Sequence, residues 1–375
     1  MLKKTPRRRG RTTDDKPNWQ RSQKQHAVRK WVYRIGFTAL SLAILFSSIQ
    51  LFTFINHIKS PLSAAPGTDS QTEYWSGSER LTTLFLKLDD RDSTKAEITD
   101  SAIIIIDPLL TRLTIVSIPV TVSLNSGQLN NTSDVLHSVQ AIRHNVSREL
   151  AIPIDRYLVT DVKGMTKLSK DLGYFPSGQL RDDITDLNQK LDNARSIFGI
   201  KTLKNDIAEG FWTDLSLTEI NTILKRVKNL STDNIELNVL SGQFLQDKSL
   251  PDKRSISTIN TEAFDEYFKE KLSNPDITEE HVKIDVLNAT STPGMAVKIA
   301  RYIENSGGEI INLGNHAEKK EYCYIQTFIE NPDESYTVRY LTSLFRCPVE
   351  AGDPTLQNRA DIVFVIGTDM LNEGY

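Results

Sequence analysis

The sequence predicts an α/β protein with two folded domains behind a single N-terminal transmembrane helix. Residues 35–55 form a run of 21 residues without a charged side chain. Between residues 80 and 280, β-branched runs alternate with apolar residues at helical spacing, and a shorter alternation of the same kind follows in 280–370. A length of 375 residues suits two domains of ordinary size.

The composition excludes several classes of protein. A hydrophobic content of 39% excludes a wholly disordered chain, and two cysteines exclude a disulfide-rich scaffold. A mean hydropathy of −0.34 excludes a polytopic membrane protein. The net charge of −3 conceals an asymmetry, because residues 1–34 carry twelve lysines and arginines against two aspartates. A basic tail therefore precedes an acidic remainder.

The uncharged run at 35–55 predicts a membrane anchor. As a helix it is about 31 Å long, which matches the roughly 30 Å hydrocarbon core of a bilayer. The positive-inside rule places the basic tail, residues 1–34, in the cytoplasm and the C-terminal domains outside the cell membrane. A cleaved signal peptide is the alternative, but the apolar run is longer than the usual 7–15 residues. Beside a membrane helix, the tail's charges contact anionic lipids, so no nucleic-acid partner is expected.

The next elements follow in chain order. Residues 56–79, rich in Ser, Pro, Gly and Thr, predict a linker. Residues 80–275 predict a sheet flanked by helices. Its expected elements are a strand at 80–89, a hairpin of strands at 102–107 and 112–118, a helix at 133–150, a helix at 184–198, and a helix opened by the capping box of Ser216 and Glu219.

Residues 280–370 predict a small α/β domain after the polar stretch at 273–280. Its expected strands lie at 282–287, 309–313, 322–329 and 361–366, and its expected helices at 294–305 and 335–345.

Two aspartates suggest a metal site. Asp89 ends the first strand of the 80–275 domain, and Asp100 immediately precedes the second. If those strand ends adjoin, both carboxylates can converge on Mg²⁺, which accepts one or two carboxylates together with substrate phosphates. The alternative is a solvated loop that keeps one end of the sheet soluble. No nucleophile elbow, P-loop, dinucleotide fingerprint or zinc spacing is present.

The two cysteines, Cys323 and Cys347, both fall in the last domain. Outside the membrane a disulfide is allowed, and it would close a loop of about 25 residues. Two buried free thiols are the alternative.

Several segments resemble the LytR–CpsA–Psr family. Leu84–Arg91, Thr99–Ser101 and Ser117–Pro119 resemble the start of that family's domain. Later stretches of the same domain, and then of the LytR C-terminal domain, are similar to Ile152–Tyr157, Asp161–Gly164, Phe211–Leu217, Val286–Thr290 and Asp361–Asp369. Together the two resemblances cover most of residues 80–370.

The resemblance implies a function. Members of the family are bacterial, membrane-anchored and outward-facing, and they use Mg²⁺ to transfer glycopolymers from a polyprenyl-pyrophosphate carrier onto peptidoglycan. Carried over by position, Asp89 and Asp100 fall on the metal-associated aspartates, and Arg91 falls on the arginine beside the first of them.

The family's other arginines are absent here. Ile98 and Val120 stand where the family has arginine, and no Arg-x-Arg occurs between Tyr174 and Phe211. A bidentate arginine clamp on pyrophosphate cannot be replaced by Ile or Val. We therefore predict a degenerate member, a pseudoenzyme that binds lipid-linked or cell-wall glycopolymer, or a partner protein, without catalysis.

Two alternatives stay open. In the first, Asp89 and Asp100 hold Mg²⁺ in an active glycopolymer phosphotransferase, with Arg91, Arg143, Arg156 or Lys163 serving the phosphates. In the second, the protein is an envelope-linked regulator or transcriptional attenuator that acts through its basic tail.

Overall fold

The computed structural model describes residues 56, 59–65, 74–93, 96–124, 127–129, 139–171, 205, 207–250, 255–352 and 359–372. The predicted cytoplasmic tail, the predicted transmembrane helix at 35–55 and the predicted helix at 184–198 lie outside these residues. Within the described ranges, no helix is both long enough and apolar enough to cross a membrane. Residues from Lys59 onward belong to one compact unit.

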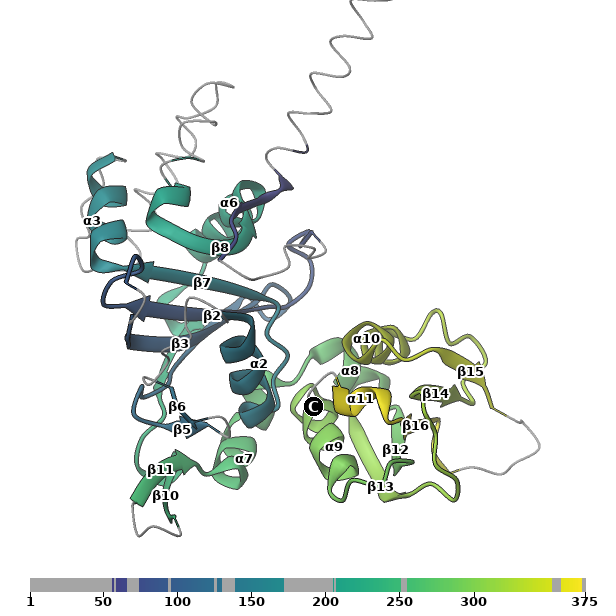
Figure 1. Ribbon diagram of the computed structural model, residues 1–375. Helices are drawn as coiled ribbons and strands as arrows, with labels where there is room; N and C mark the ends of the chain where they lie inside the picture. The colour runs from purple at the N-terminus through teal and green to yellow at the C-terminus, as the bar shows by residue number, and fades with distance from the viewer. Residues whose placement is uncertain are drawn as a thin grey trace, which may run out of the picture. The chain divides into compact units, whose positions relative to one another are not determined.

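A seven-stranded mixed sheet organises the first half of this unit (Figure 1). β2 and β7 pair in parallel, as do β4 and β9, and the other neighbours are antiparallel. The strands in spatial order are β1 (Pro61–Ser63), β8 (Phe211–Ser216), β7 (Arg156–Asp161), β2 (Leu81–Leu88), β3 (Ile98–Asp107), β4 (Arg112–Ser117) and β9 (Ile235–Val239).

Both faces of this sheet are covered, which explains the uninterrupted apolar run in β3. Ile103 and Ile105 belong to the core that includes α2 (Val139–Leu150) and α7 (Thr261–Leu272). Ile104 and Ile106 belong to the cluster beneath α6 (Leu217–Lys228) on the other face. The smaller elements are α3 (Val162–Asp171), the pair β5 (Ser123–Leu124) and β6 (Gly127–Gln128), the pair β10 (Leu245–Ser249) and β11 (Ser255–Ile259), and the 3₁₀ turns at Thr232–Asn234 and Gly242–Phe244.

The predicted first strand, the hairpin and the capping box of α6 are all present. The predicted helix at 133–150 is described from Val139 onward as α2. The predicted linker at 56–79 differs from the structure at two points. Pro61–Ser63 adds an edge strand to β8, and Trp75 is buried, with its backbone N–H donating to Glu219. These partners are more than 140 residues away in the sequence, so the composition of residues 56–79 could not predict them.

A five-stranded sheet forms the C-terminal module, with each predicted strand and helix present. The strands in spatial order are β13 (Glu309–Asn315), β12 (Lys283–Asn288), β16 (Ile362–Ile366), β14 (Tyr324–Thr327) and β15 (Val349–Ala351). The helices are α8 (Pro275–Glu280), α9 (Met295–Asn305), α10 (Tyr336–Phe345) and α11 (Asp369–Asn372). α9 begins at Gly294, whose φ of +81° is a conformation that glycine adopts without strain.

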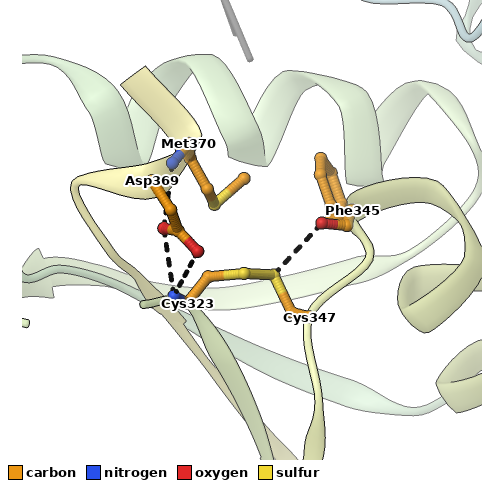
Figure 2. Close-up of a disulfide and its surroundings, with 5 residues drawn as sticks. All are labelled: Cys323, Phe345, Cys347, Asp369 and Met370. Atoms are coloured by element: carbon orange, nitrogen blue, oxygen red, sulfur yellow. Dashed lines mark hydrogen bonds between the residues drawn. A yellow bond between two sulfur atoms is a disulfide. The ribbon is translucent and has the colours of Figure 1, made fainter. Parts of the chain in front are cut away.

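A disulfide joins Cys323, just before β14, to Cys347, just after α10 (Figure 2). The two Cα atoms are 5.4 Å apart, and both residues are buried in the core of the module. The carboxylate of Asp369 accepts hydrogen bonds from the backbone N–H of Cys323, so the start of α11 lies against the disulfide (Figure 2).

Two ion pairs with buried carboxylates connect strands of the large sheet to the helices α6 and α2. Arg156 donates to Glu219 at 2.8 Å, and Arg143 lies 3.3 Å from Asp214. Glu219 also closes the capping box with Ser216, so one carboxylate accepts hydrogen bonds both from Arg156 of β7 and at the start of α6. Burial raises the pKa of Asp214 from 3.8 to about 6, against the opposing effect of its hydrogen bond from the Tyr157 backbone.

We expect removal of the disulfide to destabilise the C-terminal module. In the chain-entropy model, closing a loop of this length limits the unfolded chain and contributes about 3 kcal/mol to the free energy of unfolding. Urea unfolding of the Cys323→Ala/Cys347→Ala variant under oxidising conditions measures this loss. Wild-type protein in dithiothreitol is the control and should match the variant. A wild type that is equally stable with and without reductant contradicts the prediction.

Asp214 should make stability fall as pH rises. Because its folded-state pKa of about 6 exceeds the ordinary value of 3.8, the folded state binds the proton more tightly, and this stabilisation is lost between about pH 4 and pH 6. Over that interval the wild type should lose roughly 2–3 kcal/mol more than Asp214→Asn. Urea unfolding at several pH values tests this, with Asp233→Asn, an exposed aspartate, as the matched control. Parallel stability curves for wild type and Asp214→Asn would contradict it.

Candidate functional site

Parallel pairing of β2 with β7 brings two polar loops to one edge of the large sheet. Leu88 pairs with Asp161, so the carboxyl ends of both strands coincide. Asp89, Asp90 and Arg91 follow β2, and Asp161 leads into α3, which carries Lys163. We call these five residues the sheet-end site.

Asp161 is the central acceptor of the sheet-end site. Its Oδ2 accepts the backbone N–H of Arg91 at 2.9 Å, and its Oδ1 accepts the backbone N–H of Gly164 at 2.6 Å. The Nε of Arg91 lies 3.5 Å from the same carboxylate. Since Asp161 is buried, it fixes the loop after β2 to the first turn of α3.

Arg91 lies inside the protein rather than on its surface. Only 9% of the residue is exposed, and its guanidinium lies 5.5 Å from the ring centre of Trp212. Nη2 donates to the carbonyl oxygen of Glu209, whereas Nε and Nη1 have no hydrogen-bond partner among the described residues. The guanidinium is therefore enclosed by Asp161, Glu209 and Trp212, but only one of its three nitrogens is hydrogen-bonded there.

Asp89 closes the loop between β2 and β3. Its Oδ1 accepts the backbone N–H groups of Glu97 at 2.8 Å and Asp90 at 2.7 Å. Asp100 lies on β3 opposite Lys87, and both aspartates are exposed. In the described part of the chain, no three or more His, Cys, Asp or Glu side chains come together as a metal cluster. A Mg²⁺ ion here would have Asp100 and the second oxygen of Asp89 as protein ligands, with substrate oxygens completing its shell, and magnesium stays a prediction.

Lys163 supplies an exposed cation beside this loop. Its Nζ donates to Asp90 at 2.7 Å. That hydrogen bond lowers the pKa of Asp90 and raises the pKa of Lys163. Because the pair faces solvent, it contributes little to stability.

α3 packs very closely against the chain just before β8. A Cβ atom at Gly164 would lie 2.4 Å from the carbonyl oxygen of Gly210 and 3.1 Å from Arg91. Glycine at this position therefore lets α3 lie close enough for Asp161 to bind both loops. Asp161, Glu209 and Trp212 have no individual role in the sequence prediction, although the segments Asp161–Gly164 and Phe211–Leu217 carried part of the family resemblance.

The arginines predicted as alternative phosphate ligands do not meet at the sheet-end site. Arg156 begins β7, at the opposite end of the strand from Asp161, and it pairs with Glu219. Arg143 lies on α2 and pairs with Asp214. Of the four basic residues considered, only Arg91 and Lys163 lie at this edge.

Residues 281–369 match the family model described as LytR cell envelope-related transcriptional attenuator. The chain thus carries a LytR C-terminal module, and the predicted resemblance is confirmed for that module. No curated protein matches the chain.

Solved structures similar to this chain include three bacterial proteins. The transcriptional regulator YvhJ from Bacillus subtilis is 17% identical, with a TM-score of 0.37, over 52% of this chain and 97% of that one. B. subtilis TagV is 16% identical, with a TM-score of 0.36, over 50% of this chain and 94% of that one. TagT, solved bound to LI-WTA, is 14% identical, with a TM-score of 0.37, over 57% of this chain and 95% of that one.

Substituting Asp161 should disrupt the sheet-end site. Asp161→Asn removes the charge that faces Arg91 and weakens the bonds to two backbone N–H groups, so we expect the free energy of unfolding to fall by roughly 2–3 kcal/mol. Urea unfolding measures the change. Asp92→Asn, in the exposed part of the same loop, is the matched control and should stay within about 0.5 kcal/mol of wild type. Equal stability of the two variants would contradict the central role of Asp161.

Proposed function

We propose that this chain is a single-pass bacterial envelope protein that binds lipid-linked or cell-wall glycopolymer without transferring it. The LytR C-terminal module at 281–369 supports a place in the cell envelope. The uncharged run at 35–55 and the basic residues before it support a membrane anchor with a cytoplasmic N-terminus. The resemblance of residues 80–275 to LytR–CpsA–Psr domains supports the choice of a glycopolymer as ligand.

The inward position of Arg91 is the observation that favours binding over catalysis. Phosphoryl transfer needs preorganised cations aimed at the charge that develops on the phosphate oxygens. The guanidinium of Arg91 instead lies inside the protein, with Nε 3.5 Å from Asp161 and Nη2 donating to Glu209 beside Trp212.

The positions where the family has further arginines are part of the core here. Ile98 is 2% exposed within β3, and Val120 packs against the same core. Removing a single preorganised donor from such a site typically costs about 10²–10³ in rate. A sheet edge without these donors retains surfaces for binding but little means of stabilising a leaving pyrophosphate.

The proposal predicts binding without turnover. Full-length protein in detergent micelles should sediment with purified cell-wall sacculi, because the ectodomain recognises their glycan. The same protein, mixed with a polyprenyl-pyrophosphate-linked glycan, peptidoglycan and Mg²⁺, should form no transfer product. A LytR–CpsA–Psr enzyme with its full set of arginines is the positive control.

Two variants separate the proposal from the transferase alternative. If product forms, and Asp89→Ala or Asp100→Ala abolishes it while Asp92→Ala does not, the magnesium-dependent transferase replaces the binding protein. If wild-type protein neither sediments with sacculi nor retains the lipid-linked glycan, the proposed ligand is wrong.

A further inference from the structure

A cavity of about 560 Å³ opens between the large sheet and the C-terminal module. Its volume lies within the range of small-molecule sites. It is lined by the chain leading into β2, by α2, by the loop before β7, and by α9 and α10. The sheet-end site follows the carboxyl ends of β2 and β7, whereas this cavity lies at their amino ends. The two are therefore separate sites.

Specific contacts hold the two walls of the cavity together. Arg301 on α9 pairs with Asp265 on α7 at 2.6 Å. Asn305 donates to the carbonyl oxygen of Leu150 at 3.2 Å and to Asp265 at 3.0 Å. These bonds join the C-terminal module to α2 and α7, so the recess between them is a built feature of the fold.

Two stacked tyrosines contribute aromatic faces to the cavity, and a third tyrosine, Tyr302, is buried in its wall. Tyr336 and Tyr340 stack on α10 with their ring centres 6.4 Å apart and 15° between their planes. The hydroxyl of Tyr340 bonds the hydroxyl of Ser306 at 2.7 Å, and the hydroxyl of Tyr336 accepts from Asn274 at 3.0 Å. Tyr302 is held in the same way by Ser147 at 3.3 Å. Anchored hydroxyls orient the rings, which then present flat apolar surfaces.

Hydrogen-bonding groups of both kinds surround these rings. Asp155 accepts the backbone N–H of Thr82 at 2.8 Å through Oδ2, and no hydrogen bond from a described residue reaches its Oδ1. The residue is exposed, yet desolvation by the surrounding protein raises the pKa of its carboxyl. Gln140 adds an exposed amide group that can donate and accept, whereas the buried amides of Asn274 and Asn305 already donate to Tyr336, Leu150 and Asp265.

Two of the three arginines that line the cavity are paired with carboxylates. Arg80 lies 3.0 Å from Asp107 and also donates to the carbonyl oxygens of Leu272 and Ser273. Arg143 pairs with Asp214. Both carboxylates lie outside the cavity lining, whereas Arg346 lines the cavity and forms no ion pair with a described residue, so one cation of the lining is available to a ligand.

We propose that this cavity binds a saccharide unit whose hydroxyls bond Asp155 and the amide of Gln140 while its C–H face packs on the tyrosine rings. A sugar has hydroxyls that both donate and accept hydrogen bonds and it carries an apolar face, which is the combination that this lining complements. The choice of a wall saccharide rests on the proposed function.

The first experiment blocks the cavity with a bulky side chain and leaves the contacts between its two walls in place. Full-length protein in detergent micelles is titrated calorimetrically with the disaccharide of N-acetylglucosamine and N-acetylmuramic acid. Ser343 is exposed and lines the cavity on α10, so Ser343→Trp should weaken binding at least about tenfold by occupying the space. Lys298→Trp, on the exposed side of α9 and outside the lining, is the matched control and should bind like wild type.

A second variant tests whether the Asp155 carboxylate contributes to binding. Asp155→Asn keeps an acceptor for Thr82 but removes the charge, and it should weaken disaccharide binding about tenfold. Asp247→Asn, an exposed aspartate on β10 outside the lining, is its control. Disaccharide binding that survives both Ser343→Trp and Asp155→Asn overturns the cavity as the site. Binding of pyrophosphate in place of disaccharide, lost in Ser343→Trp, overturns the saccharide in favour of an anion.

The sedimentation assay with sacculi separates this inference from the proposed function. If wild-type protein sediments with sacculi but does not bind the disaccharide, the saccharide cavity fails and the proposed function stands. If the disaccharide binds and Ser343→Trp abolishes that binding, but the chain retains neither sacculi nor lipid-linked glycan, the proposed function fails and the cavity stands.

Discussion

The parallel pairing of β2 with β7 determines where the polar chemistry of the large domain lies. Because the two strands run in the same direction, their carboxyl ends place the Asp89–Arg91 loop beside Asp161. Their amino ends place Thr82 beside Asp155, where the cavity begins. A parallel pair requires a long crossover, and here α2 lies within it and covers one face of the sheet. The parallel direction of β2 and β7 therefore accounts for the position of α2 and for the position of both polar edges.

Buried charges in this fold lie close to groups of opposite charge or to carbonyl oxygens, and Arg91 is one example. A guanidinium inside a protein needs a carboxylate or carbonyl acceptors, and Arg91 finds both in Asp161 and Glu209. Arg156 is satisfied in the same way by Glu219. Arg91 differs from Arg156 in one respect, because its Nε and Nη1 have no hydrogen-bond partner among the described residues. Ile98 belongs to the core and Val120 packs against it, as their apolar side chains require, whereas Arg91 is a buried charge beside Asp161.

Much of the fold could be predicted because its signals are local. The apolar run of β3, the capping box of α6 and the helical spacing of α9 and α10 each occupy a few consecutive residues. The edge strand at Pro61–Ser63 has no such signal, since three residues become a strand only through their pairing with β8. Trp75 is buried for a similar reason, because its partner Glu219 lies far along the chain.

The same holds for the site residues, whose roles could be predicted only where their partners are near in the sequence. Asp89 and Asp100 could be assigned to the ends of two neighbouring strands because β2 and β3 are consecutive and pair antiparallel. The role of Asp161 could not be predicted, because it depends on a strand pairing across 70 residues. The cavity depends on still more distant partners, since its walls come from α2 and from α9 and α10 of the C-terminal module.

A ligand held in such a cavity touches both the sheet domain and the C-terminal module. Its binding free energy therefore adds to that of the ion pair between Arg301 and Asp265, which already joins them. By linkage, anything that binds only the docked arrangement stabilises that arrangement. Asn305 strengthens this connection, because its side-chain amide bonds the end of α2 and Asp265 at once. The C-terminal module is then one wall of a binding site as well as a folded domain in its own right, and its helices α9 and α10 face the sheet domain with side chains suited to that use.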